Sequence, residues 1–293
     1  MSSIHPPAGL FIPRKRDESR AEARLREHYL VERELADRLR HSRSFAERQR
    51  LFATMYDELF ARVPDHPRLA ARRADSEYRE RNVAWNMAQL RPYLRPGCTF
   101  LEVGAGDCAL AARVSREANR VYAVDISPQA QGELPANVTF VQTDGRSIDV
   151  PPESVDVAFS DQLMEHLHPD DAVAQLDNIY RALKPGGVYL CVTPNRVYGP
   201  SDISAFFDDE ARGFHLKEYA LDELVETFRG SGFRTIHTYI GARGFFLRVP
   251  TSFVRTLEGL VEALRPDWRR AVGDHKATRA LLGLRVAGIK PRY

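Results

Sequence analysis

The chain has 293 residues, of which 43% are hydrophobic, so it can bury a sizeable core. Its 42 basic and 40 acidic residues leave a formal net charge of +2, which gives little support to nucleic-acid binding over the chain as a whole. The three cysteines, Cys98, Cys108 and Cys191, are odd in number and lack metal-ligand spacing, so neither a disulfide framework nor a zinc site is expected.

The first 95 residues predict an arm followed by helices. Residues 1–16 contain prolines and basic residues but no apolar core of a signal peptide, so we expect a flexible arm in a cytoplasmic protein. No apolar run is long enough to span a membrane. Residues 17–41 and 74–90 have helical spacing, and Ser44 with Glu47 forms a capping box that opens a helix between them. We therefore expect a helical extension over residues 17–95.

These N-terminal helices also allow a second interpretation. Residues 14–50 contain twelve Arg or Lys and eight Asp or Glu, a local excess of four positive charges. Such an excess is found on surfaces for RNA or anionic lipid, but also on solvated helix faces with i, i+4 ion pairs. The mixing of acids throughout favours the solvated face.

The stretch from Thr99 to Leu110 organises the rest of the chain. An apolar strand, Thr99–Val103, is followed by Gly104, Ala105 and Gly106 and then by a helical pattern over residues 107–118. This order also fits a dinucleotide-binding turn. Glu102 argues against that, because its carboxylate would face a pyrophosphate of like charge. A cationic cofactor fits better.

Five segments in order resemble class I S-adenosylmethionine (SAM)-dependent methyltransferases: Glu102–Gly106, Val121–Ser127, Val141–Gly145, Val155–Leu167 and Leu183–Asn195. The resemblance implies that Asp125 binds the ribose hydroxyls of SAM and that Asp144 accepts from its adenine amino group. The full set of cofactor-binding residues expected on this basis is Glu102, Gly104, Ala105, Gly106, Asp125, Ile126, Asp144, Gly145 and Asp161. The departure is Cys108, which stands where a third glycine is often found.

The alternation of strands and helices from residue 99 onward predicts an α/β fold with a doubly wound sheet. The resemblance implies seven strands, mostly parallel, with an antiparallel last strand at residues 283–291 and a sixth at 233–240. The methyltransferase domain is expected over residues 96–293, with an acceptor-loop insertion at 194–217 and a helical insertion at 245–282. Helices before the first motif commonly lie across the cofactor cleft in this family, so residues 17–95 are expected to form a lid.

Residues after the fourth strand face the methyl group in this fold, and there the chain has Glu165 and His166. The unperturbed pKa of a histidine lies near neutral pH, so His166 can accept a proton from the acceptor, and His215 is a second candidate base. Tyr78, Tyr198, Phe206 and Phe207 are expected to line the acceptor pocket. A metal site from Asp161, Glu165, His166 and His168 is conceivable, but methyl transfer does not require a metal and none is expected.

The sequence thus predicts transfer of a methyl group from SAM to an oxygen or nitrogen atom of a small molecule, such as a natural-product, sugar or lipid intermediate. Two alternatives stay open at this stage: an RNA-modifying methyltransferase that uses the Arg-rich helices, and a SAM-binding scaffold without activity. We expect a monomer or homodimer.

Overall fold

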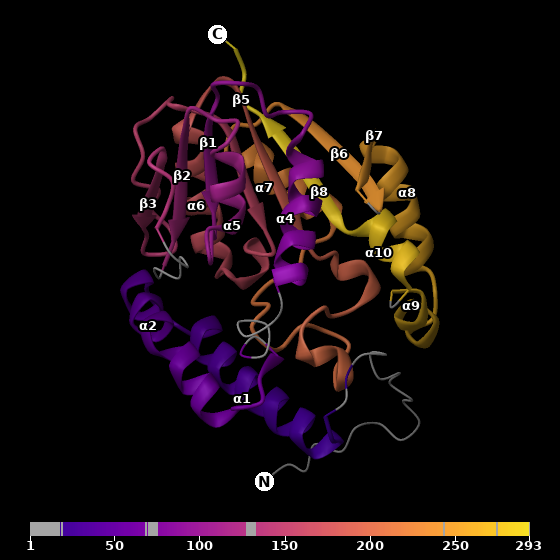
Figure 1. The fold of residues 1–293 in the computed structure, drawn as a ribbon. Coiled ribbons are helices and arrows are strands. Elements are labelled where there is room, and N and C mark those ends of the chain that lie inside the picture. The colour runs from indigo at the N-terminus through magenta and orange to yellow at the C-terminus, as the bar shows by residue number, and fades with distance from the viewer. Residues whose placement is uncertain are drawn as a thin grey trace.

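A mostly parallel sheet forms the centre of the computed structural model, which describes residues 18, 20–67, 69, 76–126, 133–242, 244–273 and 275–292 (Figure 1). The strands are β1 (Thr99–Val103), β2 (Arg120–Asp125), β3 (Val138–Gln142), β4 (Val155–Asp161), β5 (Leu183–Thr193), β6 (Thr235–Ala242), β7 (Phe245–Val249) and β8 (Leu284–Ile289). Their order across the sheet is β3-β2-β1-β4-β5-β8-β6-β7. Strands β1 to β5 pair in parallel, and β8 lies antiparallel between β5 and β6.

The sheet has eight strands in the described residues, not the predicted seven. The additional strand, β7, occupies the start of the segment that was predicted to be a helical insertion, and it pairs antiparallel with β6. Gly244 makes the connection with a φ of +84°, which favours glycine. Gly241 on β6 leaves room for the ring of Phe246, because an added Cβ would lie only 2.2 Å from it. Phe245 and Leu247 point to solvent on this edge strand, so its apolar side chains did not show the alternation of a half-buried strand.

Helices cover both faces of the sheet (Figure 1). They are α1 (Glu22–Arg40), α2 (Phe45–Arg62), α4 (Ser76–Leu90), α5 (Ala109–Val114), α6 (Pro169–Ala182), α7 (Leu221–Gly230), α8 (Thr251–Glu262), α9 (Pro266–Gly273) and α10 (Lys276–Leu282), with short 3₁₀ turns η1 (Met164–His166), η2 (Arg196–Tyr198) and η3 (Ile203–Phe206). Side chains alternate along β1, so that Leu101 and Val103 join the core under α6 and α7, whereas Phe100 joins the core under α4 and α5. None of the described helices is long and apolar enough to cross a membrane.

The N-terminal helices lie at the edge of the sheet where the parallel strands end (Figure 1). The Ser44 cap is confirmed, since its side chain accepts a hydrogen bond from the Glu47 backbone N–H and α2 begins at Phe45. Apolar residues of α1 and α2, among them Leu35 and Leu59, pack together with Phe214 of the 194–217 segment. The helices therefore bury their stripes against each other and against that segment. Residues 1–16 lie outside the described residues, and the domain boundaries stay a prediction.

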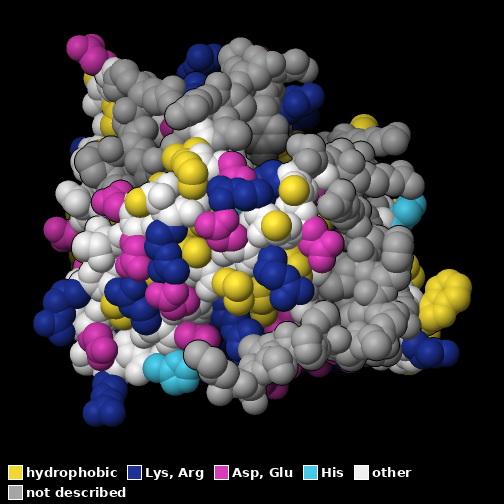
Figure 2. Space-filling view, turned by 90° about the horizontal axis from the view of Figure 1, so that it is seen from below, with side chains coloured by type: hydrophobic (Ala, Val, Ile, Leu, Met, Phe, Trp, Pro, Cys, Tyr) yellow, Lys and Arg dark blue, Asp and Glu magenta, His cyan; other side chains and the backbone are white. Residues whose placement is uncertain are grey.

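Ion pairs link the charged side chains on the exposed face of α1 and α2. Figure 2 views the molecule from below, where α1 and α2 lie, and shows Lys and Arg interspersed with Asp and Glu. Arg62 pairs with Glu34 at 2.7 Å and with Glu58 at 3.1 Å, and Arg38 pairs with Glu58 at 2.8 Å. The positive charges of these arginines are thus compensated within the helices.

One buried ion pair fixes the N-terminal helices to the sheet domain. The guanidinium of Arg48 on α2 donates two hydrogen bonds to the carboxylate of Asp171 on α6, at 2.6 and 2.7 Å. Both side chains are almost fully buried. Loss of either partner would leave a buried charge without its counter-ion, which is costly in a low-dielectric interior.

We therefore expect Arg48→Ala to lower the free energy of unfolding by about 3–5 kcal/mol, the range for a broken buried ion pair. Arg50→Ala, at an exposed position of the same helix, is the matched control and should stay within about 0.5 kcal/mol of the wild type. Urea unfolding followed by circular dichroism measures both. Equal stability of the two variants would mean that the Arg48–Asp171 pair contributes nothing net.

Candidate active site

The turn between β1 and α5 is built from left-handed backbone. Gly104 and Gly106 have φ values of +78° and +51°, and Cys108 follows at +59°. A Cβ on Gly106 would meet no heavy atom within 4 Å, so the turn is open in front of that residue. The left-handed φ of Cys108 explains why a glycine would suit this position. Helix α5 begins at Ala109, two residues later than predicted.

Glu102, at the end of β1, carries an unsatisfied buried oxygen. Its Oε2 is buried without a hydrogen-bond partner. Burial raises the pKa of the Glu102 carboxyl well above its usual value, and the nearby carboxylates of Asp107, Asp161 and Asp125 raise it further. Three acids around a buried fourth favour a cationic ligand at this turn.

The other predicted cofactor residues lie along the same edge of the sheet. Asp125, at the end of β2, accepts a hydrogen bond from the Gly106 N–H at 2.8 Å. Asp144 accepts from the backbone N–H groups of Arg146 and Ser147, so its carboxylate holds its own loop. Ile126 follows β2 with 40% of its surface exposed and lies beside Gly145, whereas Ala105 is buried in the core under α5.

Helix α4 contributes polar residues to this edge that the sequence analysis missed. Asn86 donates to the carboxylate of Asp161 at 3.0 Å, and Gln89 donates to Asn86 at 3.1 Å. Arg79 forms an ion pair with Asp107 in the glycine turn at 2.9 Å. Arg79, Asn86 and Gln89 recur at intervals of seven and three, which places them on one helix face and was the available signal.

A cavity of about 340 Å³ lies between the N-terminal helices and the 194–217 segment. Its lining residues come from α1 and α2, from the residues just before α1 and just after α2, from η1 and from the 194–217 segment: Glu18, Arg20, His28, Glu32, Tyr56, His66, Pro67, His166, Ser201, Asp202, Ile203, Phe206, Phe214 and His215. The cavity therefore brings together His166 and His215, whose ring centroids lie 4.8 Å apart.

Glu165 and His166 occupy η1, directly after β4. Nδ1 of His166 donates to the carbonyl oxygen of Phe214 at 2.9 Å, and Glu165 Oε2 accepts from the hydroxyl of Thr193 on β5 at 2.9 Å. Oε1 of Glu165 is buried and has no hydrogen-bond partner. Burial raises the pKa of the Glu165 carboxyl to about 7.

His215 is paired with Glu218, a residue that the sequence analysis did not single out. Its Nδ1 lies 2.5 Å from Glu218 Oε1, which also accepts from the Ser201 N–H. Burial alone lowers the pKa of His215, but the bond to Glu218 and the charges of Glu165 and Asp202 outweigh it and raise this pKa. The i, i+3 spacing of a histidine and a glutamate was the only signal in the sequence.

The predicted acceptor-binding aromatics separate into different environments. Phe206 lines the cavity, and Phe207 packs on Tyr29 of α1 with ring centroids 5.1 Å apart. Tyr198 is buried in the main core, where its hydroxyl accepts from the Asn195 N–H, and it is not among the cavity-lining residues of the described chain. The side chain of Tyr78 lies outside the described residues.

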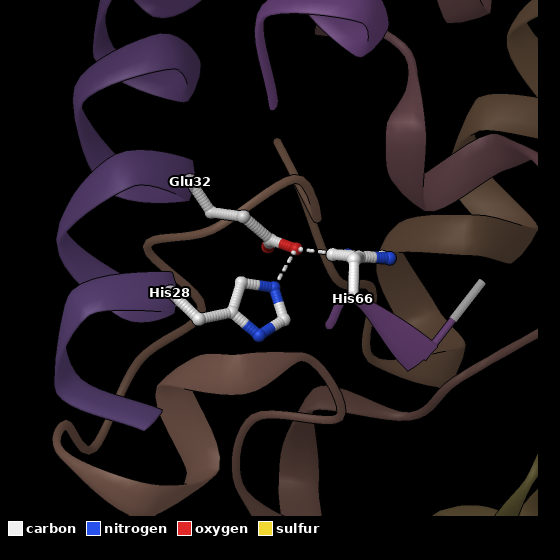
Figure 3. A group of neighbouring side chains, drawn as sticks. All are labelled: His28, Glu32 and His66. Atoms are coloured by element: carbon white, nitrogen blue, oxygen red, sulfur yellow. Dashed lines mark hydrogen bonds and ion pairs between the residues drawn. The ribbon is translucent and has the colours of Figure 1, made fainter. Parts of the chain in front are cut away.

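A second group of titratable side chains lies on the N-terminal side of the cavity (Figure 3). Glu32 accepts hydrogen bonds from His28 Nε2 at 2.7 Å and from His66 Nε2 at 3.1 Å on the same oxygen. Its other oxygen accepts from the Phe214 N–H at 3.2 Å. Burial raises the pKa of Glu32, but the two histidines outweigh it and hold that pKa below its usual value. The sequence analysis missed this group, although His28 and Glu32 stand at i, i+4.

Residues 101–191 match a family described as "Methyltransferase domain". Three curated proteins align with the chain at similar identity. A Mycolicibacterium smegmatis protein named "Probable S-adenosylmethionine-dependent methyltransferase" is 31% identical over 147 residues, 48% of this chain and 54% of that protein. The ubiquinone biosynthesis O-methyltransferase of Paramagnetospirillum magneticum is 32% identical over 41% of this chain and 50% of its own length.

The third relative is phosphoethanolamine N-methyltransferase 1 of Triticum aestivum, which is 31% identical over 31% of this chain and 20% of its own length. The chain thus spans about half the length of the first two relatives and a fifth of the third. The family match, residues 101–191, runs from within β1 to within β5 and holds the glycine turn and η1.

The unsatisfied oxygen of Glu102 has a consequence for stability in the ligand-free protein. Because the Glu102 pKa is raised on folding, the folded state holds this proton more tightly than the unfolded state, so stability falls as the pH rises above about 4.5. We expect Glu102→Gln, which does not titrate, to be more stable than the wild type at pH 8 by about 1–3 kcal/mol, the cost of an unsatisfied buried group.

Thermal unfolding from pH 4 to pH 8 measures this difference, which should shrink toward zero at the acidic end. Glu226→Gln, at an exposed position, serves as the control and should follow the wild type throughout. If Glu102→Gln is less stable than the wild type at pH 8, the buried Glu102 carboxylate does not destabilise the ligand-free protein, and the proposed reason for cation binding there is wrong.

Proposed function

Since the chain carries a class I SAM-dependent methyltransferase domain, we propose that it transfers a methyl group from SAM to an oxygen or nitrogen atom of a small molecule bound in the cavity. The observation that carries the proposal is the position of His166. This residue lies five positions after Asp161 at the cofactor edge of the sheet, and it also lines the cavity. The segment from β4 to η1 thereby connects a cofactor site with an acceptor site.

The residues of the glycine turn fit the cofactor. SAM carries a sulfonium and an amino group, and supplies an electrophilic methyl group. Glu102, with its unpartnered Oε2, and the surrounding acids offer the negative potential that such a cation needs. Asp125 would hold the ribose hydroxyls, while the exposed side chain of Ile126 offers an apolar surface for the adenine ring.

The cavity fits a small acceptor. Its volume of about 340 Å³ lies at the lower end of the range for ligand sites. Its wall combines aromatic rings, such as Tyr56 and Phe206, with imidazoles and carboxylates. Helix α1 and the 194–217 segment, joined by the bond between Glu32 and the Phe214 N–H, would act together as the lid.

Methyl transfer requires that the acceptor be held close to the methyl group and that the acceptor atom lose its proton. Holding the acceptor in near-attack geometry can supply roughly 7–11 kcal/mol. An acceptor hydroxyl or protonated amine must also lose a proton, and Glu165, His166 and His215 are the groups on this side of the cavity that can promote the loss.

Two relatives are named for N-methylation of phosphoethanolamine and for O-methylation in ubiquinone biosynthesis, which supports a small-molecule acceptor. The ion pairs among the arginines of α1 and α2 offer no support for the RNA alternative. A natural-product, sugar or lipid intermediate remains our proposed acceptor class. Incubating the enzyme with methyl-labelled SAM and fractionated metabolite extracts tests it, since the labelled product identifies the acceptor.

Calorimetry should show that the full chain binds SAM and its demethylated product but not NAD. Asp125→Ala should weaken SAM binding by about 1.5–3 kcal/mol, the range for hydrogen bonds to a charged group. Asp149→Ala, an exposed acid outside the site, should bind SAM like the wild type. Tight NAD binding with no response to SAM would refute the proposal, and an unchanged SAM affinity in folded Asp125→Ala would remove this residue from the site.

His166→Ala and His215→Ala should each leave SAM affinity nearly unchanged, because neither residue belongs to the cofactor motifs. At least one of them should lower turnover by about 10² or more, the usual scale for loss of acid–base assistance. His41→Ala, an exposed histidine of the N-terminal helices, controls for general effects. If both single variants and the double variant keep wild-type turnover, acceptor activation does not involve these imidazoles.

A further inference from the structure

Two groups of side chains in the described parts of the chain have the composition and spacing to bind a metal ion: His28, Glu32 and His66, and Glu165, His166 and His215. In each group the possible ligand atoms lie within 4.8 Å of one another. The hydrogen bonds on the far side of each imidazole decide which group is suited to a metal, because a histidine ligand must present a lone pair to the ion.

The first group has the wrong proton arrangement. Nη1 of Arg20 lies 3.1 Å from Nδ1 of His28. A guanidinium only donates hydrogen bonds, so Nδ1 of His28 is the acceptor and its Nε2 carries the proton that Glu32 accepts. That nitrogen therefore has no lone pair for a metal, and the positive charge of Arg20 would repel one.

The second group has the opposite arrangement. Nδ1 of His166 faces the carbonyl oxygen of Phe214, which only accepts, so Nδ1 carries the proton and Nε2 bears the lone pair. Nδ1 of His215 likewise faces the carboxylate of Glu218. A carbonyl on one imidazole and a carboxylate on the other are the partners that orient metal-bound histidines.

Glu165 provides an independent observation. Its side chain is fully buried, Oε2 is held by Thr193, and Oε1 has no hydrogen-bond partner. Oε2 of Glu218, behind His215, is also buried without a partner. Unsatisfied carboxylate oxygens in a buried site are costly, and a bound cation would offset that cost.

We propose that Glu165, His166 and His215 bind a divalent first-row transition-metal ion at the wall of the cavity. Two imidazoles and one carboxylate suit manganese, iron, cobalt or zinc better than magnesium or calcium, which prefer oxygen ligands. Bonds of about 2.0–2.2 Å bring two ligand atoms to at most about 4.4 Å from each other. Binding therefore requires only a small contraction of the group.

The site deepens the proposed function and rests on it for its role in catalysis. His166 and His215 line the cavity, so an ion between them has an open side toward the acceptor. There the ion would lower the pKa of an acceptor hydroxyl. The hydroxyl proton passes to water, the oxygen forms its bond to the methyl carbon, and the cofactor sulfur keeps the electrons of the broken carbon–sulfur bond.

Metal binding can be measured without any acceptor. The full chain is treated with a chelator, desalted and titrated with Co²⁺, followed by its visible absorption, and with Zn²⁺ by calorimetry. We expect one equivalent of either ion to bind. His215→Ala and Glu165→Gln should lower the affinity at least 100-fold, and Glu218→Gln, which changes only the partner of His215, should lower it about 10- to 100-fold.

His28→Gln is the matched control, because it alters the other His–Glu–His group and should keep the affinity and stoichiometry of the wild type. Circular dichroism checks that each variant folds, and the isosteric Glu165→Gln and Glu218→Gln keep the test valid if His215→Ala does not fold. No binding of Co²⁺ or Zn²⁺, or binding lost in His28→Gln and retained in Glu165→Gln, overturns the proposal.

SAM binding in the chelator-treated protein separates the two proposals. If the protein binds SAM and methylates its acceptor fully without metal, the catalytic role of the metal fails and the methyltransferase proposal stands. If it binds one equivalent of Co²⁺ through these residues but no SAM, the metal site stands and the methyltransferase proposal fails.

Discussion

Burying a carboxylate oxygen away from water without a hydrogen-bond partner is costly in a folded chain, and this protein does so repeatedly near one edge of its sheet. Glu102, Glu165 and Glu218 each keep one buried oxygen without a hydrogen-bond partner. Where the chain has a partner to offer, it supplies one, as Arg48 does for Asp171 and the two histidines do for Glu32. The carboxylates left unsatisfied therefore indicate where ligands with positive charge belong.

The parallel strands explain why these carboxylates gather. Strands β1, β2 and β4 end at the same edge, so the acidic residues in their last two positions, Glu102, Asp125 and Asp161, lie near the glycine turn. The N-terminal helices and the 194–217 segment then cover that edge and enclose the cavity. The sheet positions the proposed cofactor residues, and the added helices and segment position the proposed acceptor residues.

Much of the sheet domain was predictable because its signals are local. Strands β1, β2 and β4 are apolar runs that end at a glycine or an acidic residue, and the turn at Gly104 is visible in sequence alone. The carboxylate of Glu102 could be recognised as unusual before any contact was known. Strand β7 was missed because Phe245 and Leu247 point to solvent, so its pattern does not separate core from surface.

The partners within the cavity were less predictable because they are distant in sequence. His66 meets Glu32 only after the turn that follows α2 has packed on α1, and the Phe214 N–H meets the same carboxylate only after the 194–217 segment has packed there. Neither pair has a periodic signal that separates it from a solvated helix face. The sequence analysis named both His166 and His215 as bases, and His215 brings the 194–217 segment to within 4.8 Å of the His166 ring centroid.

The long sequence separation of the contacts that α1 and α2 make also bears on the order of folding. Helices α1 and α2 emerge first from the ribosome, but Asp171 and Phe214, which they bind, follow Arg48 and Glu32 by 123 and 182 residues. Until then, the two helices can cover their apolar stripes only against each other. Nascent chains paused before residue 171 should thus hold a helical hairpin that has not docked, and the cavity forms only after residue 214 has been synthesised.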